Sequence, residues 1–386
     1  MTTSTARRTW ATTTLLTAAM AFSMLPLFLL GALAPALVAE FGIARPLLGV
    51  LVTAGFGVAA VLSLVIGPVV DAVGARRSAT ALFAISTVTL TLFAVAPHYL
   101  VLVLTVALGG VPQALANPAT NKIIGRAVPG PKRGLVIGIK QSGVQLGAFA
   151  AGLPLAGLAG WVDWRLAVGV AASCAAFATA ASVLLPADPE PANRPPLRVG
   201  LTAEPAVWWL LGFSVLLGAG ISSVNTYSAL YATEELGLAA QPAAALIAAL
   251  GVTGIIGRIG WSRLVSAQRP PSAVLGPLAG GAVLAAGALL AAQFAGWGWA
   301  WVGVLGIGAF AVAANAVSML AVMGLSTPHQ TGRDSALVSA GFFGGFTIGS
   351  PAFGLIADFG GYPFGWALVA AEFAAAAIVV WLWRRT

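Results

Sequence analysis

Hydrophobic positions fill twelve long stretches of the chain, and polar positions gather in the short connections between them. Each stretch runs for roughly twenty residues, the length that an α-helix needs to cross the apolar core of a bilayer. A membrane β-barrel would instead show segments of about ten residues with alternating polarity. The pattern therefore predicts twelve membrane-spanning helices, over residues 12–38, 47–70, 79–97, 99–121, 134–159, 165–185, 206–233, 242–264, 273–294, 298–325, 335–357 and 364–383.

The composition agrees with a membrane protein and excludes most soluble classes. Of the 386 residues, 59% are hydrophobic and 8% are charged, whereas soluble domains carry about 25% charged residues. One cysteine and two histidines are too few for a disulfide framework or for a zinc or haem centre. We therefore expect no metal site and no cofactor. A membrane enzyme is not expected either, because no cluster of His, Cys or carboxylate residues shares one depth.

The connection between the sixth and seventh spans differs from the others. Residues 186–204 contain five prolines, and proline-rich segments are extended and semi-rigid. This segment divides the spans six and six. We expect an N-terminal six-helix bundle over residues 1–185, a linker over 186–204 and a C-terminal six-helix bundle over 205–386.

A weak internal repeat supports this division. Arg133, at the start of the fifth span, matches Arg333 at the start of the eleventh, and Asn117 in the fourth span matches Asn315 in the tenth. Related halves of this kind are typical of transporters. The predicted fold class is an all-α membrane protein with two pseudo-symmetric six-helix bundles.

Basic residues are distributed unequally between the two ends of the spans. Arg45 and Arg165 lie at one end, and most of the others lie at the end that carries both termini. Because Lys and Arg collect in cytoplasmic loops, we expect both termini and the linker to be cytoplasmic. The net charge of +8 then reflects topology, so a nucleic-acid partner is not expected. The bases at the terminal end are Arg7, Arg8, Arg76, Arg77, Arg126, Lys132, Arg133, Arg194, Arg198, Arg263, Arg269, Arg333, Arg384 and Arg385.

A charged motif follows the second span, with Gly67, Asp71, Gly74, Arg76 and Arg77 in the order Gly-Pro-Val-Val-Asp-Ala-Val-Gly-Ala-Arg-Arg. It resembles the signature between helices two and three of the major facilitator superfamily. The resemblance covers essentially the whole chain and implies a bacterial inner-membrane transporter that works by alternating access. It also implies that these five residues form a gate that latches the outward-open state. We expect Gly67 to allow close helix approach and Asp71 to bridge to the eleventh span or to nearby bases.

Three bases, Lys122, Lys140 and Arg258, lie within spans or at their edge, where charged residues are costly and usually functional. Lys122 is four residues from Arg126, and we expect it to reach the interface. Lys140 belongs to a Lys-Gln-Ser-Gly segment similar to one in bacterial facilitators of unassigned substrate. Gly257 and Arg258 resemble the eighth-helix element of monocarboxylate and oxalate carriers, where the arginine meets the substrate carboxylate. A guanidinium binds a carboxylate through two parallel hydrogen bonds. The alternatives are snorkelling of Lys140 to the interface and an interfacial position for Arg258.

Uncharged residues within the spans complete the predicted substrate site. They are Asn117, Gln145, Asn225, Tyr227, Asn315 and Phe342. An interfacial aromatic belt remains an alternative for Tyr227, and ordinary helix packing for Phe342. The proton-coupling residue stays unknown from the sequence. Glu372, in the last span, is a candidate, although the resemblance implies a twelfth helix away from the cavity.

Two functions compete. The first is secondary active transport of a small organic anion such as a monocarboxylate, held by Lys140 and Arg258, with or without co-transport of a proton. The alternative is proton-driven efflux of drugs or metabolites, for which the fifth span carries only a distorted form of the expected glycine-proline motif. In both cases we expect a monomer whose partners are a small molecule and the lipid bilayer.

Overall fold

The computed structural model describes residues 3–128, 130–188, 204–268, 271–325 and 331–386, and within them all regular structure is helical. The elements are α1 (Thr3–Ala32), α2 (Ala34–Phe41), α3 (Arg45–Ser63), α4 (Ile66–Val73), α5 (Ala75–Val95), α6 (Tyr99–Ala127), α7 (Gly130–Ala150), η1 (Ala151–Leu155), α8 (Ala156–Trp161), α9 (Trp164–Ala181), η2 (Ser182–Leu184), α10 (Pro205–Glu234), α11 (Ala240–Gln268), α12 (Pro271–Ala295), α13 (Gly298–Ile307), η3 (Gly308–Val312), α14 (Ala313–Leu325), α15 (Thr331–Gly360) and α16 (Tyr362–Trp383).

The described residues contain twelve helical segments that are long and apolar enough to cross a membrane, as the sequence predicts. Five of the twelve expected spans are not uniform α-helices. The first is divided into α1 and α2, and the second into α3 and α4. The fifth and the tenth pass through the π-helices η1 and η3, and the sixth ends in the 3-10 helix η2. In η1 the cause is Pro154, which lacks the N–H that a regular α-helix needs at this point. Large apolar side chains on the outer surface, such as Leu284 and Phe177, are more than three-quarters exposed. Such a surface is suited to contact with lipid chains.

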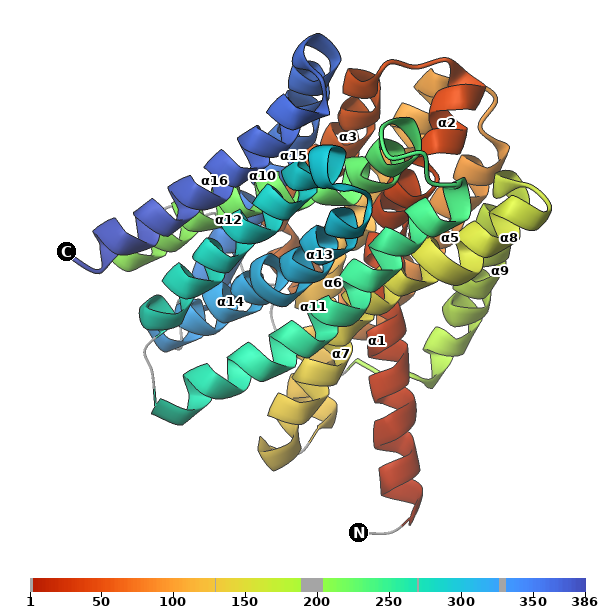
Figure 1. Ribbon diagram of the computed structural model, residues 1–386. Coiled ribbons are helices and arrows are strands. Elements are labelled where there is room, and N and C mark those ends of the chain that lie inside the picture. The colour runs from red at the N-terminus through yellow and green to blue at the C-terminus, as the bar shows by residue number, and fades with distance from the viewer. Residues whose placement is uncertain (1–2, 129, 189–203, 269–270, 326–330) are drawn as a thin grey trace.

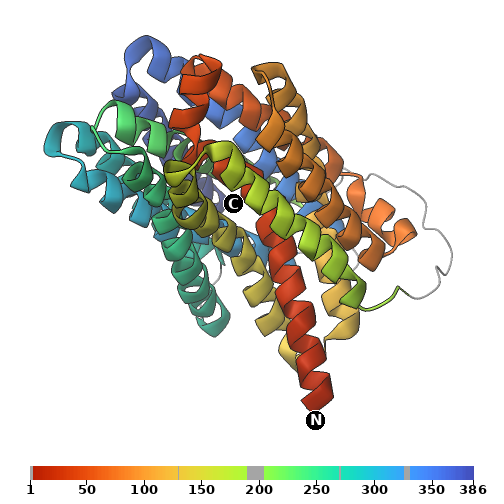
Figure 2. The same ribbon diagram turned by 90° about the vertical axis from the view of Figure 1, so that its right-hand side faces the viewer.

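The helices form two halves, α1 to α9 and α10 to α16, which fan apart toward the end that carries the termini (Figure 1). The N-terminus lies at the free end of α1, far from α2 and the start of α3, in both views (Figures 1 and 2). We call these two ends of the molecule the terminal end and the Arg45 end. The expected linker lies almost wholly outside the described residues, which resume at Glu204 after Asp188.

Glycines allow the two halves to meet at backbone distance. A Cβ atom on Gly49 of α3 would lie 2.6 Å from the backbone of Pro351 in α15. A Cβ atom on Gly251 of α11 would lie 2.7 Å from the carbonyl oxygen of Gln145 in α7. Small residues at such crossings are how membrane helices approach closely without a hydrophobic driving force. Gly49 and Gly251 therefore permit two close crossings between the halves, α3 with α15 and α7 with α11.

Polar contacts join the halves at the Arg45 end. Arg45 Nε and Nη2 donate to one carboxylate oxygen of Glu234, at 3.0 and 2.8 Å, and Nη1 donates to the carbonyl oxygen of Ala357 at 3.2 Å. Tyr362 donates to the same Glu234 oxygen at 2.9 Å, and its ring lies under the guanidinium. Deeper in the molecule, Phe56 of α3 stacks on Phe346 of α15 with 4.4 Å between ring centroids. The two halves are therefore closed against each other at this end.

A second ion pair at the Arg45 end stays within the N-terminal half. Arg165 of α9 pairs with Glu40 of α2 at 2.5 Å, and the indole of Trp164 donates to the other Glu40 oxygen at 2.7 Å. These hydrogen bonds, first from Trp164 and then from Arg165, hold the pKa of the Glu40 carboxyl below its usual value. The pair ties α2 to α9 without reaching the other half.

The charged motif lies at the terminal end, and its contacts stay within the N-terminal half. Asp71 of α4 pairs with Lys122 of α6, which is a nearby base and not the eleventh span. Asp188, just after the sixth span, accepts hydrogen bonds from the backbone N–H groups of Ala75 and Arg76. It also pairs with Arg126 at 3.3 Å. Asp188 therefore caps α5 and fastens the end of the sixth span to the motif.

The two glycines of the motif have different environments. Gly74 has a φ of +101°, and a Cβ atom there would lie 2.3 Å from Asp188 Oδ2. Only glycine tolerates that combination of backbone angle and close contact. A Cβ atom on Gly67 would meet nothing within 4 Å. The expectation that Gly67 allows close helix approach is therefore wrong in this conformation.

Candidate functional site

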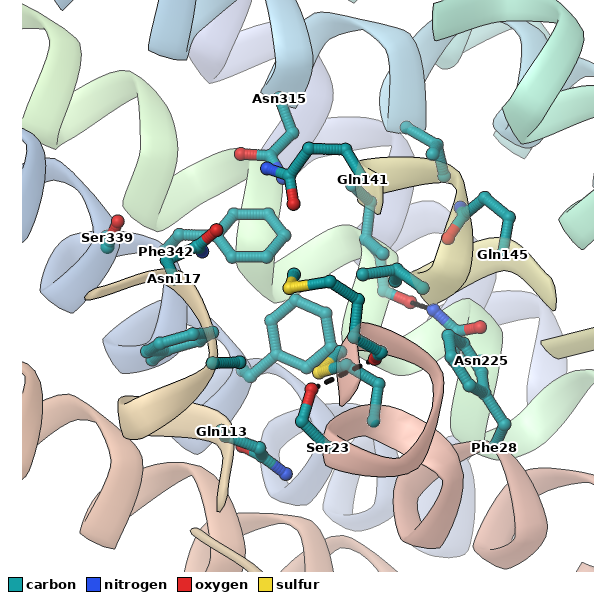
Figure 3. A pocket seen from close by; sticks show the side chains of 18 of the residues that line it. Ser23, Phe28, Gln113, Asn117, Gln141, Gln145, Asn225, Asn315, Ser339 and Phe342 are labelled. Atoms are coloured by element: carbon teal, nitrogen blue, oxygen red, sulfur yellow. Dashed lines mark hydrogen bonds between the residues drawn. The ribbon is translucent and has the colours of Figure 1, made fainter. Parts of the chain in front are cut away.

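A cavity lies between the two halves, and its walls come from α1, α6 and α7 on one side and α10, α11, η3, α14 and α15 on the other (Figure 3). Its volume of about 90 Å³ has room for several water molecules or one small solute. The larger apolar lining side chains are Met20, Met24, Phe28, Val144, Ile221, Leu250, Val312, Met319, Phe342, Phe343 and Phe346. The polar lining side chains are Ser23, Gln113, Asn117, Gln141, Gln145, Asn225, Arg258, Asn315 and Ser339.

The carboxamides of the cavity wall present atoms without partners among the described residues. These are one side-chain oxygen each of Gln113, Gln141, Gln145, Asn225 and Asn315. All five are buried from solvent, and a buried polar atom without a hydrogen bond is costly and calls for an explanation. Because all five residues line the same cavity, a polar ligand or ordered water in it is the natural partner for oxygens that point into it. An amide can donate as well as accept hydrogen bonds.

Arg258 is the single charged residue among the described residues that line the cavity. It is half-buried, and its Nε has no hydrogen-bond partner. Two glycines of α11 let the helix that carries Arg258 pack closely against α7 and η3. A Cβ atom on Gly254 would lie 2.7 Å from Gln145 Nε2, and one on Gly257 would lie 2.7 Å from the carbonyl oxygen of Ala309. A guanidinium on the wall of a cavity, with a buried Nε–H that has no partner among the described residues, is suited to an anion.

Lys140 does not line the cavity. Its side chain is fully buried in the N-terminal half, and its Nζ donates to Thr120 Oγ1 at 2.8 Å and to Asn117 Oδ1 at 2.9 Å. The sulfur of Met20 lies 3.9 Å away. The amine is therefore not snorkelling to the interface, and it sits behind Asn117 instead of beside Arg258. The pairing of two cations across the cavity, which the sequence suggested, is not found.

Two further candidates lie away from the cavity wall. The Tyr227 hydroxyl donates to the carbonyl oxygen of Arg45 at 2.8 Å, and the ring stacks on Phe353. Tyr227 therefore belongs to the contacts that close the Arg45 end. Glu372 of α16 is not a lining residue, and its Oε2 is buried without a hydrogen-bond partner. This agrees with a peripheral twelfth helix.

The structure brings together the other predicted site residues. Asn117, Gln145, Asn225, Arg258, Asn315 and Phe342 all line the cavity. Asn117 and Asn315, which match in the internal repeat, reach it from opposite halves. The sequence prediction did not include Gln113 and Gln141, although Gln113 lies one helical turn before Asn117 and shares its face. It also missed the first-span contribution of Phe28 and the methionines, because apolar residues there are indistinguishable from packing residues.

The described residues contain no group of three or more His, Cys, Asp or Glu side chains that could hold a metal ion. In the same part of the chain, no lining residue of the cavity is a carboxylate, histidine or cysteine. The cavity combines polar groups that can orient a bound molecule with apolar walls that enclose it, as small-molecule sites do.

Comparison with known proteins agrees with this architecture. The structure is similar to that of a bacterial homologue of the human lysosomal transporter Spinster in an inward-facing and occupied conformation, with a TM-score of 0.77 and 18% identity, over 98% of this chain and 96% of that one. The inward-facing and unoccupied form of such a homologue gives a TM-score of 0.76 and 16% identity, over 97% and 96% of the chains. No curated protein sequence matches the chain. The model of the Major Facilitator Superfamily matches residues 16–309, so this chain belongs to that superfamily and is a membrane transporter.

Proposed function

We propose that this transporter moves a small organic anion, of the monocarboxylate type, by alternating access. The observation that carries the proposal is Arg258. It is the one charged side chain among the described cavity-lining residues, its Nε is unpartnered, and no lining carboxylate opposes it. In a low-dielectric site an unopposed cation favours an anionic ligand over a neutral or cationic one.

The rest of the wall narrows the substrate class. The unpartnered amides of Gln113, Gln141 and Asn315 favour a ligand with hydrogen-bonding groups besides its charge, such as a hydroxyl or an amine. The phenylalanine and methionine side chains favour an apolar portion. A small hydroxy- or amino-carboxylate combines these features and suits the volume of the cavity.

The proposed orientation places both termini in the cytoplasm of a bacterial inner membrane. It rests on the excess of Lys and Arg at the terminal end. In that orientation the Arg45 end faces outward and is closed, so the conformation described is inward-facing. The gate at the cytoplasmic side would contain Gly67, Asp71, Gly74, Arg76 and Arg77. We further propose that the protein acts as a monomer.

The test is ligand binding by purified protein, measured as a shift in melting temperature. A ligand that binds only the folded state stabilises it by RT ln(1 + [L]/Kd). We expect small carboxylates to stabilise the wild type and Arg258→Ala to bind them at least about tenfold more weakly, as for loss of a charge-assisted hydrogen bond. Arg258→Lys should restore little, because the planar fork is lost. Gln145→Ala is the control that removes polarity without charge.

If Arg258→Ala keeps wild-type affinity for the carboxylates, the anion proposal fails. The alternative is proton-driven efflux of drugs or other metabolites, and the observation that favours it is the set of three methionines in the wall, since methionine adapts to varied apolar ligands. Stabilisation by cationic drugs in place of carboxylates would select that function. Uptake of the anion with a proton would appear as acidification of the lumen of proteoliposomes; Glu372 is the residue to test for such coupling, with Glu372→Gln.

A further inference from the structure

The buried Lys140 lies directly behind one polar position of the cavity wall. Among the described residues, its Nζ contacts acceptor atoms of Asn117, Thr120 and Met20. None of these is an acid, so the amine is held by neutral acceptors only. Of the three, Asn117 and Met20 also line the cavity. Lys140 is thus separated from the cavity by a single layer of side chains.

The orientation of the Asn117 amide follows from this contact. An ammonium group has three donors and no acceptor, so only the oxygen of the amide can face it. The neighbouring Thr120 hydroxyl donates to the carbonyl oxygen of Ala116, so its oxygen is likewise free only to accept from Lys140. With Asn117 Oδ1 fixed toward Lys140 at 2.9 Å, the Nδ2 group, with its two N–H bonds, is left on the other side of the amide. No described residue accepts a hydrogen bond from it.

We infer that Lys140 is a positioning residue that turns Asn117 into an obligatory hydrogen-bond donor to the substrate. The fixed amide offers N–H groups from the N-terminal half, while Arg258 offers N–H groups from the C-terminal half. Both therefore recognise an acceptor group, and an anionic oxygen is the acceptor that suits them best. The inference deepens the proposed function and rests on it for the charge of the ligand.

Asn315 provides a comparison, because its side-chain amide has no lysine against it in the part of the chain that the structure describes. It is the repeat counterpart of Asn117 and lines the same cavity from the other half. Its Oδ1 is buried without a partner among the described residues, so nothing forces it to donate. The residue that matches Lys140 in the second half is Ala340. The two halves thus differ, with Lys140 and Asn117 in one and Ala340 and Asn315 in the other. In the N-terminal half, the asparagine is held as a hydrogen-bond donor for an acceptor group of the ligand.

The experiment is a double-mutant cycle on affinity, with lactate and its neutral analogue lactamide as probes of the purified full chain. The variants are Lys140→Met, Asn117→Leu and the two combined. We expect each single variant to bind lactate roughly tenfold more weakly. The double variant should bind no more weakly than Asn117→Leu alone, because Lys140 acts only through Asn117.

Other results would overturn the inference. If the two losses multiply in the double variant, Lys140 acts by its own charge and not by orienting the amide. If the variants lower the melting temperature but leave lactate affinity unchanged, the cluster is only structural. If Asn117→Leu binds lactate as well as the wild type, the inference fails while the anion proposal stands. If lactate and lactamide bind equally well to the wild type and equally poorly to Asn117→Leu, the anion proposal fails and the donor role of Asn117 holds.

A ligand-free measurement decides the orientation if neither probe binds. Asn117→Asp places a carboxylate against Lys140, so the melting temperature should rise in the chain with Lys140 and fall in the Lys140→Met background. Asn315→Asp is the matched control, and it should lower the melting temperature in both backgrounds. A fall for Asn117→Asp in both backgrounds would show that Lys140 does not face the amide oxygen.

Discussion

Breaking the ion pair between Arg45 and Glu234 should release the closed Arg45 end. The change we consider is Glu234→Gln, which keeps the shape and removes the charge. The glutamate oxygen accepts two hydrogen bonds from the guanidinium, at 3.0 and 2.8 Å, and one from Tyr362 at 2.9 Å. These contacts exist only while the N-terminal and C-terminal halves are together at this end.

The magnitude follows from the burial of the pair. The two side chains are 25% and 31% exposed, between a surface pair, worth about 0–1 kcal/mol, and a buried charge-assisted hydrogen bond, worth about 1.5–3 kcal/mol. We take about 1–2 kcal/mol as the loss. That loss changes the ratio of the closed to the open Arg45 end by a factor of about 5–30.

Spin labels on the two halves would measure the change. Trp161 and Trp297 lie at the Arg45 end of opposite halves and are 85% and 57% exposed. Cysteines can replace them after Cys174, which is exposed, is changed to alanine. We expect the long-distance population between the labels to grow in Glu234→Gln.

The control is Glu40→Gln. It breaks an ion pair of similar exposure at the same end, but that pair joins α2 and α9 within one half. The distance distribution should then stay as in the wild type. An unchanged distribution in Glu234→Gln, or an equal shift in Glu40→Gln, would refute the assignment of the Arg45 contacts as the closing device.

Three further predictions concern single positions. Gly74→Ala should destabilise the protein by about 1–3 kcal/mol, because the φ of Gly74 is +101° and the new Cβ would meet Asp188. Gly67→Ala places its Cβ in open space, so this control variant should have the melting temperature of the wild type. Asp71→Asn removes the ion pair with α6 and should slow transport at wild-type expression, so unchanged uptake in proteoliposomes would exclude Asp71 from gating. The Glu40 pKa is lowered in the folded protein, first by the hydrogen bond from Trp164 and then by that from Arg165. Its stabilisation is therefore present above the unfolded-state pKa and is lost as the pH falls through the folded-state pKa. Melting temperatures of the wild type and Glu40→Gln should converge as the pH falls below the usual pKa of a glutamate.

The sequence by itself determined the fold and the depth of most polar residues. Continuous apolar stretches fix twelve spanning helices, because backbone groups in lipid have no partners outside the helix itself. The motif from Gly67 to Arg77 indicated the superfamily. Polar residues inside a membrane span cost free energy, so their presence in the apolar stretches pointed to a functional site. Six of the eight substrate-site candidates, among them Arg258 and Asn315, line one cavity.

Only the tertiary structure decided which side of each helix faces the cavity. Lys140 and Gln141 are neighbours in the sequence and both are polar. The packing of α7 against α1 and α6 buries the lysine and turns the glutamine toward the cavity. In the same way, Tyr227 is drawn to the closed Arg45 end by the carbonyl oxygen of Arg45, a residue 182 positions away. Such contacts depend on which helices become neighbours, and local sequence patterns carry no information about a partner that distant in the chain.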